Sequence, residues 1–164
     1  MTYHTFAHTI PAAYSLLPDR MASPEATALL LSVGLQESEF LFRRQMPKGP
    51  ARGFWSFERA GGVQGVLEHG ATKRHVRIAL EALSYPTALD VYHVHAALEH
   101  NDVLACCFAR LLLWTLPEAL PGRLEVEVGW DQYLAAWRPG KPHIATWPKN
   151  YHLAWALVEP EVVT

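Results

Sequence analysis

The sequence predicts a mainly α protein that forms one domain over residues 1–164, with about eight helices and at most a small β hairpin. A length of 164 residues suits a single domain with a sizeable core. Half of the residues are hydrophobic and 18% are charged, a balance that argues against intrinsic disorder. Helix-start signals and apolar faces with helical spacing recur along the chain, whereas an alternating strand pattern stands out once.

The first part of the chain contains two helix starts and then an irregular stretch. Residues 9–17 are expected to form a helix that a proline ends. Ser23 is a suitable N-cap, and the proline and glutamate after it predict a second helix over 24–42. Glycine and proline are frequent between 47 and 53, so we expect residues 43–62 to be irregular, apart from a small hairpin.

Helical patterns dominate the second part of the chain. The helix expected over 103–114 is apolar on all sides, which predicts a central position in the core. Residues 117–129 are expected to form a loop, although residues 124–128 alternate as in a strand. In full, five helices are expected here, over residues 73–84, 88–100, 103–114, 130–137 and 147–158.

The composition restricts the partners that this protein is expected to have. A net charge of −2 gives no reason to expect a nucleic-acid partner. Protonation of all nine histidines would raise this charge to +7, so a polyanion becomes a better partner at acidic pH. No apolar run reaches the roughly 20 residues of a membrane-spanning helix, and no integral membrane segment is expected. No long heptad pattern occurs, which favours a monomer.

The cysteine and histidine patterns predict neither a disulfide nor a metal site. Cys106 and Cys107 are adjacent, a spacing that suits neither a relaxed disulfide nor a pair of zinc ligands, so we expect both in the core. His93 and His95 would point in different directions on a helix. Nucleotide-binding and nucleophile-elbow motifs are absent, and we expect no metal and no cofactor.

Glu37 is the residue whose pattern most favours a chemical role. On the helix expected over 24–42 its neighbours at helical spacing are apolar or glycine, among them Val33, Phe40 and Leu41. Burial and the negative end of the helix dipole both raise the pKa of a carboxyl group at this position. A carboxyl that stays protonated near neutral pH is what a general acid requires. The pattern alone fits a buried structural acid equally well.

Glu39 lies two positions further on and is expected to have a structural role. Its spacing from Arg43 is that of an i, i+4 ion pair on the solvated side of a helix. The two glutamates are therefore predicted to differ in environment although they are close in sequence.

Two segments of the chain carry a family resemblance. Residues 36–40 and 51–57 together resemble the lysozyme-like superfamily of lytic transglycosylases, goose-type lysozymes and phage lysins. The pattern in this group is a helix that ends in Glu-Ser, an irregular stretch, and then Ala-x-Gly-Leu-x-Gln. The matching positions in this chain are Glu37, Ser38, Ala51, Gly53 and Phe54.

This chain departs from the family pattern at two positions. Ser56 stands where the family usually has glutamine, and Phe108 stands where a tyrosine hydroxyl would lie near the glutamate. The missing hydroxyl is expected to come from another tyrosine, for which the candidates are Tyr92, Tyr133 and Tyr151.

The resemblance implies a lysozyme-like fold and a peptidoglycan-degrading activity. It implies cleavage of the β-1,4 bond between N-acetylmuramic acid and N-acetylglucosamine, with Glu37 as the general acid. A muramidase often uses a second carboxylate, and Glu58 is the candidate for it, although a solvated loop acid paired with an arginine is the alternative. A lytic transglycosylase needs Glu37 alone, because the 6-hydroxyl of the substrate closes a 1,6-anhydro ring. We expect one of these two activities and favour the lytic transglycosylase.

Substrate contacts are expected around the aromatic segment and on the helix over 130–137. Phe54 and Trp55 are predicted to form one wall of a sugar groove, and Arg138 is predicted to meet carboxylates of the anionic substrate. Tyr133 shares a helix face with Trp137, a spacing that fits a groove or the core equally. The complete set of expected substrate-binding residues is Ser38, Gly53, Phe54, Trp55, Ser56, Tyr92, Tyr133 and Arg138.

The N-terminal sequence and the resemblance together suggest a location. The N-terminus lacks a basic stretch followed by an apolar one, so no signal peptide is expected. We therefore expect a phage or prophage product that is made in the host cytoplasm and reaches the periplasmic cell wall through a holin or as a virion component. One alternative is a non-catalytic virion or wall-binding protein with the same fold. Another is an unrelated helical protein in which Glu37 is structural.

Overall fold

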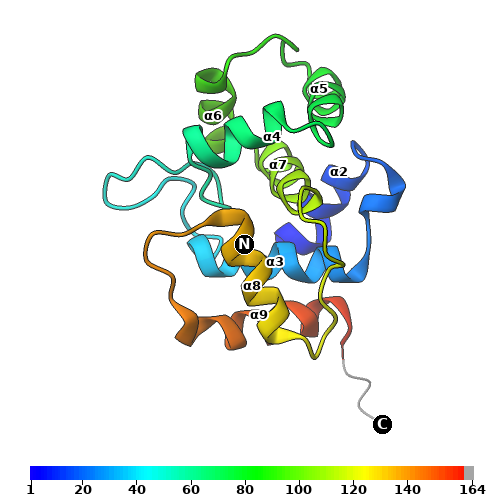
Figure 1. The fold of residues 1–164 in the computed structure, drawn as a ribbon, viewed down its shortest axis with the longest axis vertical. Helices are drawn as coiled ribbons and strands as arrows, with labels where there is room; N and C mark the ends of the chain where they lie inside the picture. The colour runs from blue at the N-terminus through cyan, green and yellow to red at the C-terminus, as the bar shows by residue number, and fades with distance from the viewer. Residues whose placement is uncertain (161–164) are drawn as a thin grey trace.

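Helices account for most of the structure, as the sequence predicts (Figure 1). The computed structural model describes residues 1–160, and within them β pairing is limited to isolated bridges of Arg44 with Arg52 and of Arg52 with Phe57. These bridges replace the expected hairpin. The elements are α1 (Thr2–His4), π-helical η1 (Thr5–Thr9), α2 (Ile10–Tyr14), η2 (Asp19–Met21), α3 (Pro24–Ser38), π-helical η3 (Arg59–Val63), α4 (Gln64–Glu68), α5 (Lys73–Ala82), α6 (Val91–His100), α7 (Asp102–Trp114), α8 (Val126–Trp137), η4 (Ile144–Thr146) and α9 (Trp147–Val158).

The core is organised around α3 and α7. Every residue in 104–113 is buried, and α7 packs against α2, α4, α5 and α6, which confirms its predicted central position. The free thiols of Cys106 and Cys107 lie in this core, as expected. α3 packs along α9 and also contacts α7. None of the helices in the described residues combines the length and the apolar composition needed to cross a bilayer.

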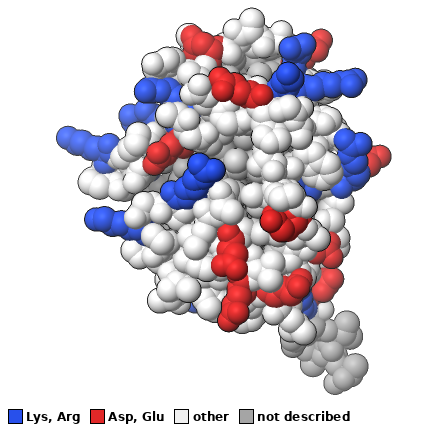
Figure 2. All heavy atoms as spheres, viewed as in Figure 1, with Lys and Arg blue, Asp and Glu red and all other residues white. Residues whose placement is uncertain are grey.

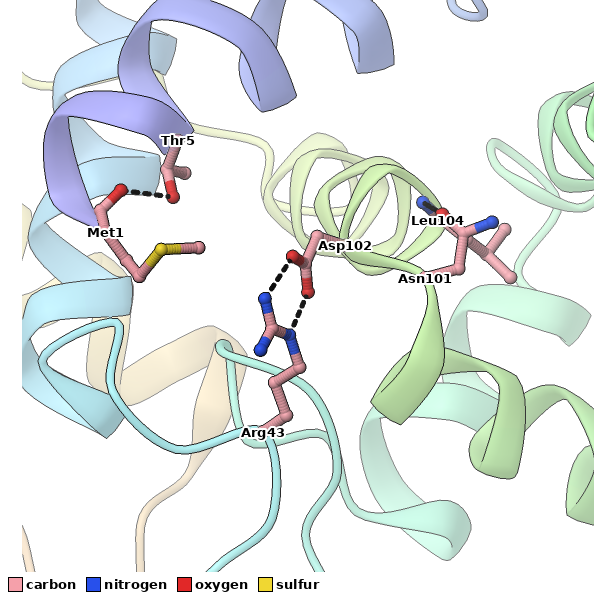
Figure 3. Close-up of polar contacts among 6 residues, drawn as sticks. All are labelled: Met1, Thr5, Arg43, Asn101, Asp102 and Leu104. Carbon is pink, nitrogen blue, oxygen red and sulfur yellow. Dashed lines mark hydrogen bonds and ion pairs between the residues drawn. The ribbon is translucent and has the colours of Figure 1, made fainter.

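Side-chain caps define the starts of three helices. The Ser23 hydroxyl accepts the amide of Ala26 at 3.0 Å at the predicted start of α3. Asn101 caps α7 in the same way, with its side-chain oxygen 3.0 Å from the amide of Leu104 (Figure 3). The start of α6 differs from the prediction, because Asp90 caps it and the helix begins at Val91 instead of residue 88.

α3 ends four residues earlier than predicted. Glu39 and Phe40 adopt positive φ angles of 52° and 53°, which turn the chain back on the helix. The buried Phe40 ring occupies the space beside Gly34, where a Cβ atom would lie 2.0 Å from the ring. The burial of this aromatic ring outweighs the strain of two left-handed residues.

The early end of α3 also removes the predicted pair of Glu39 with Arg43. The Arg43 guanidinium instead donates two hydrogen bonds, each of 2.8 Å, to the carboxylate of Asp102 (Figure 3). This pair joins the loop after α3 to the first turn of α7.

Two other predicted boundaries are wrong. Helical structure begins at Thr2, so residue 9 lies inside a helical run and not at its start. α8 begins at Val126 and includes residues that were expected in a loop or strand, while Leu124 is 91% exposed in front of it. The apolar residues of this alternating segment are not buried together, since Val128 is 40% exposed as well.

Candidate active site

A groove of about 1040 Å³ lies beside the C-terminal end of α3. Its walls come from that helix end, from residues 42–46, from the segment 56–65, and from α8 with the following residues 138–143. The loop after α3 and the loop after α8 lie on the same side of the molecule, as Figure 1 shows in cyan and orange. The groove therefore forms only when distant parts of the chain come together.

The Glu37 carboxyl group lies in this groove and is partly buried. One of its oxygens accepts a 2.5 Å hydrogen bond from the Tyr133 hydroxyl. Burial is the main cause of a raised pKa for Glu37; hydrogen bonds from Tyr133 and Ser56 oppose the rise, and the charge of Glu58 adds to it. Burial thus favours the protonated form of Glu37, and the hydrogen bonds from Tyr133 and Ser56 stabilise the carboxylate that forms when the proton is lost.

Tyr133 supplies the hydroxyl that the departure at Phe108 left open. Its ring is 3% exposed and stacks on Trp147, with the ring centroids 5.3 Å apart and the planes 10° from parallel. Burial and the nearby Glu37 raise the pKa of Tyr133, so the hydroxyl keeps its proton and acts as a donor. Aromatic packing fixes the ring, and the ring fixes the hydroxyl against Glu37.

The other two candidate tyrosines do not reach the groove. Tyr92 is 61% exposed and has the Arg59 guanidinium 4.3 Å from its ring centroid. Tyr151 is buried and donates a 2.8 Å hydrogen bond to the carbonyl of Gly122. The expected contact between Tyr92 and the substrate is therefore not supported by its position.

Ser38 and Ser56 are placed where the prediction expected them, and both line the groove. The buried Ser38 hydroxyl donates to the carbonyl of Phe54 at 2.7 Å and accepts the amide of Phe40 at 3.2 Å. It therefore joins the end of α3 to the aromatic segment. Ser56 reaches the Glu37 carboxyl group itself.

Phe54 and Trp55 do not form a wall of the groove, so this prediction is wrong. They are 1% and 0% exposed. The Phe54 ring meets Phe40 edge to face, and the Trp55 indole donates a 2.8 Å hydrogen bond to the Leu30 carbonyl inside the core. Burial of both rings, with the indole N–H hydrogen-bonded, stabilises the fold more than exposure of the rings in a groove would.

Gly53 also lies outside the groove lining and serves the backbone. Its φ angle is +74°, and a Cβ atom there would lie 2.9 Å from the Leu98 carbonyl oxygen. Glycine is needed at this turn because the chain approaches α6 closely. The match of Gly53 to the family pattern thus has a conformational cause.

Three apolar side chains provide the exposed surface that Phe54 and Trp55 do not. Phe42 and Met46 line the groove and are 52% and 63% exposed. Trp137 lines it too and donates a 2.7 Å hydrogen bond to the Trp55 carbonyl. The sequence does not predict Phe42 and Met46 as groove residues, because its pattern indicates a helix at residue 42 and an irregular stretch without defined contacts at residue 46.

Three cationic side chains line the groove. Arg138 lines it as predicted and is joined there by Arg44 and Lys141. On the face in Figure 2, Lys and Arg side chains project at the left edge and at the upper right, while Asp and Glu side chains lie near the top and in the lower half.

Glu58 is exposed and lines the groove with Glu37. Within residues 1–160 it forms no ion pair with an arginine, the alternative expected for it; Arg43 is bound to Asp102, and Arg59 lies over Tyr92. Its position leaves a second carboxylate available to the groove.

Gln36 fixes one wall of the groove next to Glu37. Its side chain donates to the His143 carbonyl at 2.9 Å and accepts from Asn150 at 2.9 Å and from Thr146 at 3.1 Å. These bonds hold the loop after α8 against α3, and they could not be predicted from the local sequence.

The histidine pair adopts the divergent arrangement of a helix. His93 bonds to Asp90 at 2.8 Å, whereas the buried His95 bonds to the Phe57 carbonyl at 2.8 Å. In the described part of the chain, no three His, Cys, Asp or Glu side chains gather as metal ligands do.

Comparisons with known proteins complete the description of the site. No family model, no curated protein and no solved structure matches this chain. The groove geometry and the motif around Glu37 are the features of this chain that indicate a function.

Proposed function

We propose that this protein is a peptidoglycan-degrading glycosidase in which Glu37 is the general acid. The observation that carries the proposal is the Glu37 carboxyl group itself: it lies in an open groove, its pKa is raised by burial, and the Tyr133 hydroxyl holds it. The resemblance of the two motifs to the lysozyme-like superfamily supports the same activity and a lysozyme-like fold.

The chemistry begins with protonated Glu37. It donates its proton to the glycosidic oxygen while the bond from that oxygen to C1 of N-acetylmuramic acid breaks. The hydrogen bonds from Tyr133 and Ser56 then stabilise the carboxylate that forms. Burial keeps the acid protonated before the step, and the two hydroxyls limit the cost of its ionisation.

The second step returns the proton to Glu37. In a lytic transglycosylase, the Glu37 carboxylate accepts the proton of the substrate's 6-hydroxyl as that oxygen bonds to C1 and closes a 1,6-anhydro ring. In a muramidase, water attacks C1 instead and Glu58 is the available second carboxylate. We favour the transglycosylase because Glu58 is exposed and, among residues 1–160, forms no ion pair that would hold it towards Glu37.

The rest of the groove suits a glycan strand with attached carboxylates. Phe42, Met46 and Trp137 offer apolar surface to the faces of sugar rings. Arg44, Arg138 and Lys141 offer positive charge to lactyl or peptide carboxylates. A phage or prophage lysin, released through a holin or carried in the virion, fits this substrate.

A non-catalytic virion or wall-binding protein is the second candidate. Ser56 favours it, because this shorter side chain replaces the usual glutamine of the family next to the proposed acid. In such a protein the groove would hold a glycan strand without cleaving it.

A digest of purified peptidoglycan distinguishes these functions. Wild type, Glu37→Gln and the matched control Glu39→Gln are compared, with soluble products identified by mass spectrometry. We expect release by wild type and by Glu39→Gln alone, since Glu39 is exposed and lies outside the groove lining. Products with 1,6-anhydro ends identify a transglycosylase, and reducing ends identify a muramidase.

The remaining outcomes exclude parts of the proposal. Equal release by Glu37→Gln and wild type removes Glu37 from the role of acid. Binding to sacculi without release by any of the three proteins supports the non-catalytic candidate.

A further inference from the structure

A second cavity, of about 770 Å³, lies between the start of α3, the C-terminal end of α7 and the segment 116–125. Among the described residues it shares only Leu116 with the groove. Its buried lining residues are Arg110 and Leu113, and its exposed ones include Arg20 and Glu118. The cavity therefore has a buried cationic end and an outer rim of mixed charge.

Arg110 is a buried guanidinium with unused donors. It is 3% exposed, and its Nε donates a 2.7 Å hydrogen bond to the Met21 carbonyl. Its Nη1 is buried without a hydrogen-bond partner, and within residues 1–160 no carboxylate forms an ion pair with it. Burial lowers its pKa, as expected for a cation without a compensating anion. A charged group in this state is stabilised by an anion that enters the cavity.

One donor of Arg110 remains for a ligand in the cavity. Nε is bound to the Met21 carbonyl and Nη1 is buried, so Nη2 is left, and a carboxylate is a charge-assisted acceptor for it. The Trp114 ring lines the cavity and has the Arg110 guanidinium 5.3 Å and the Arg20 guanidinium 5.5 Å from its centroid. Both cations are thus held at one aromatic wall.

Acidic side chains occupy the outer part of the same cavity. Glu25 is partly buried, while Glu118 and Glu125 are exposed. Glu125 accepts the Gly122 amide at 2.7 Å, whereas no hydrogen bond within the described residues engages the carboxylate of Glu25 or Glu118. These acids repel a dianion such as phosphate and attract a cationic group outside the Arg110 end.

We propose that this cavity binds a short peptide or amino acid as a zwitterion, with its carboxylate on Arg110 and its ammonium group facing Glu25 and Glu118. Leu113, Leu116 and Leu120 line the space between the charged ends and offer contact to an apolar side chain. This ligand matches both charges of the cavity, which a simple anion or cation does not. The inference does not depend on the activity of the groove.

Calorimetric titration of the intact chain with the dipeptide Ala-Leu tests the proposal. N-acetyl-Ala-Leu keeps the carboxylate alone, Ala-Leu amide keeps the ammonium group alone, and inorganic phosphate is the simple anion. We expect Ala-Leu to bind, the amide to bind at least about tenfold more weakly, and the acetylated peptide to bind severalfold more weakly. Phosphate is expected to give no measurable heat.

Variants on the wild-type background locate the site. Glu25→Gln and Glu118→Gln together are expected to weaken Ala-Leu severalfold and to leave N-acetyl-Ala-Leu unchanged. Arg77→Gln on the exposed face of α5 is the control and is expected to change neither. Arg110→Lys is expected to abolish the preference for Ala-Leu over its amide, and circular dichroism establishes whether it folds.

The comparison of ligands on wild type decides the case even if Arg110→Lys does not fold. The absence of Ala-Leu binding at millimolar concentration overturns the proposal. Equal affinity for Ala-Leu and its amide, or tighter binding of phosphate, does so too.

Discussion

The Tyr133 hydroxyl donates a 2.5 Å hydrogen bond to Glu37, and this bond connects α8 to the end of α3 across 96 positions of sequence. The tyrosine ring is stacked on Trp147, so the bond has little freedom to move. A carboxyl group that is buried yet held by a hydroxyl can both keep a proton and release one.

Tyr133→Phe is expected to reduce glycan cleavage by about tenfold, a size typical of a positioned group that assists proton transfer. In the wild type the hydrogen bond from Tyr133 lowers the pKa of Glu37. The substitution removes this bond and therefore raises the pKa of Glu37 further. The alkaline limb of the pH–rate profile, where the acid loses its proton, is expected to move to higher pH. A rate loss with an unmoved limb would assign Tyr133 a purely structural role.

Glu37→Gln is expected to stabilise the fold at alkaline pH. The pKa of Glu37 is raised in the folded state, so its protonated form favours folding below the unfolded pKa, and this contribution is lost as pH rises through the folded pKa. Thermal denaturation should show a Tm a few degrees above that of wild type at pH 8 and a much smaller difference at pH 4. Glu39→Gln, which removes an exposed carboxylate two positions away, is the matched control.

Gly34→Ala is expected to cost roughly 1–3 kcal/mol of unfolding free energy, because the added methyl group overlaps the buried Phe40 ring. Gly65→Ala in α4 is the matched control, since nothing lies within 4 Å of its added Cβ. It should stabilise by up to about 1 kcal/mol through helix propensity. Urea denaturation measures both, and equal effects of the two substitutions would contradict the packing argument.

Arg43→Ala is expected to lower the unfolding free energy by about 0.5–1 kcal/mol, because the bidentate pair with Asp102 is partly exposed. The loss should shrink in high salt, which screens the pair. A double-mutant cycle with Asp102→Ala measures the coupling directly. A coupling energy of zero would show that the pair contributes no net stability.

Phe42→Ala is expected to raise the KM for glycan severalfold without a measurable loss of stability. The ring is 52% exposed and lines the groove, so its removal takes away contact with the substrate and leaves the core intact. A drop in Tm comparable to that of a core substitution would show instead that the ring supports the fold.

The local patterns predicted the helical class and the centre of the core better than the site. The all-apolar α7 could be placed in the core because no solvated face exists on it. The end of α3 could not be predicted, because the chain leaves the helix so that the Phe40 ring fills the space beside Gly34, and this contact is not visible in the local pattern.

The same limit applies to the groove. The prediction of Phe54 and Trp55 as a sugar platform is wrong because their contacts with Phe40 and Leu30 in the core could not be seen from the local sequence. Tyr133 was one of three candidate hydroxyls, and only the packing of α8 against α9 selects it. Glu37 could be singled out because its helical neighbours and its motif are local.

α3 is a single helix of 15 residues, about 22 Å long, that lines the second cavity at Ser23 and the groove at Ser38. It behaves as one rigid rod, because its middle residues are buried between α7 and α9. A substitution that shifts α3 along its axis would therefore change the lining of the groove and of the second cavity together. The buried middle of α3 therefore also fixes the distance between Ser23 at the cavity and Ser38 at the groove.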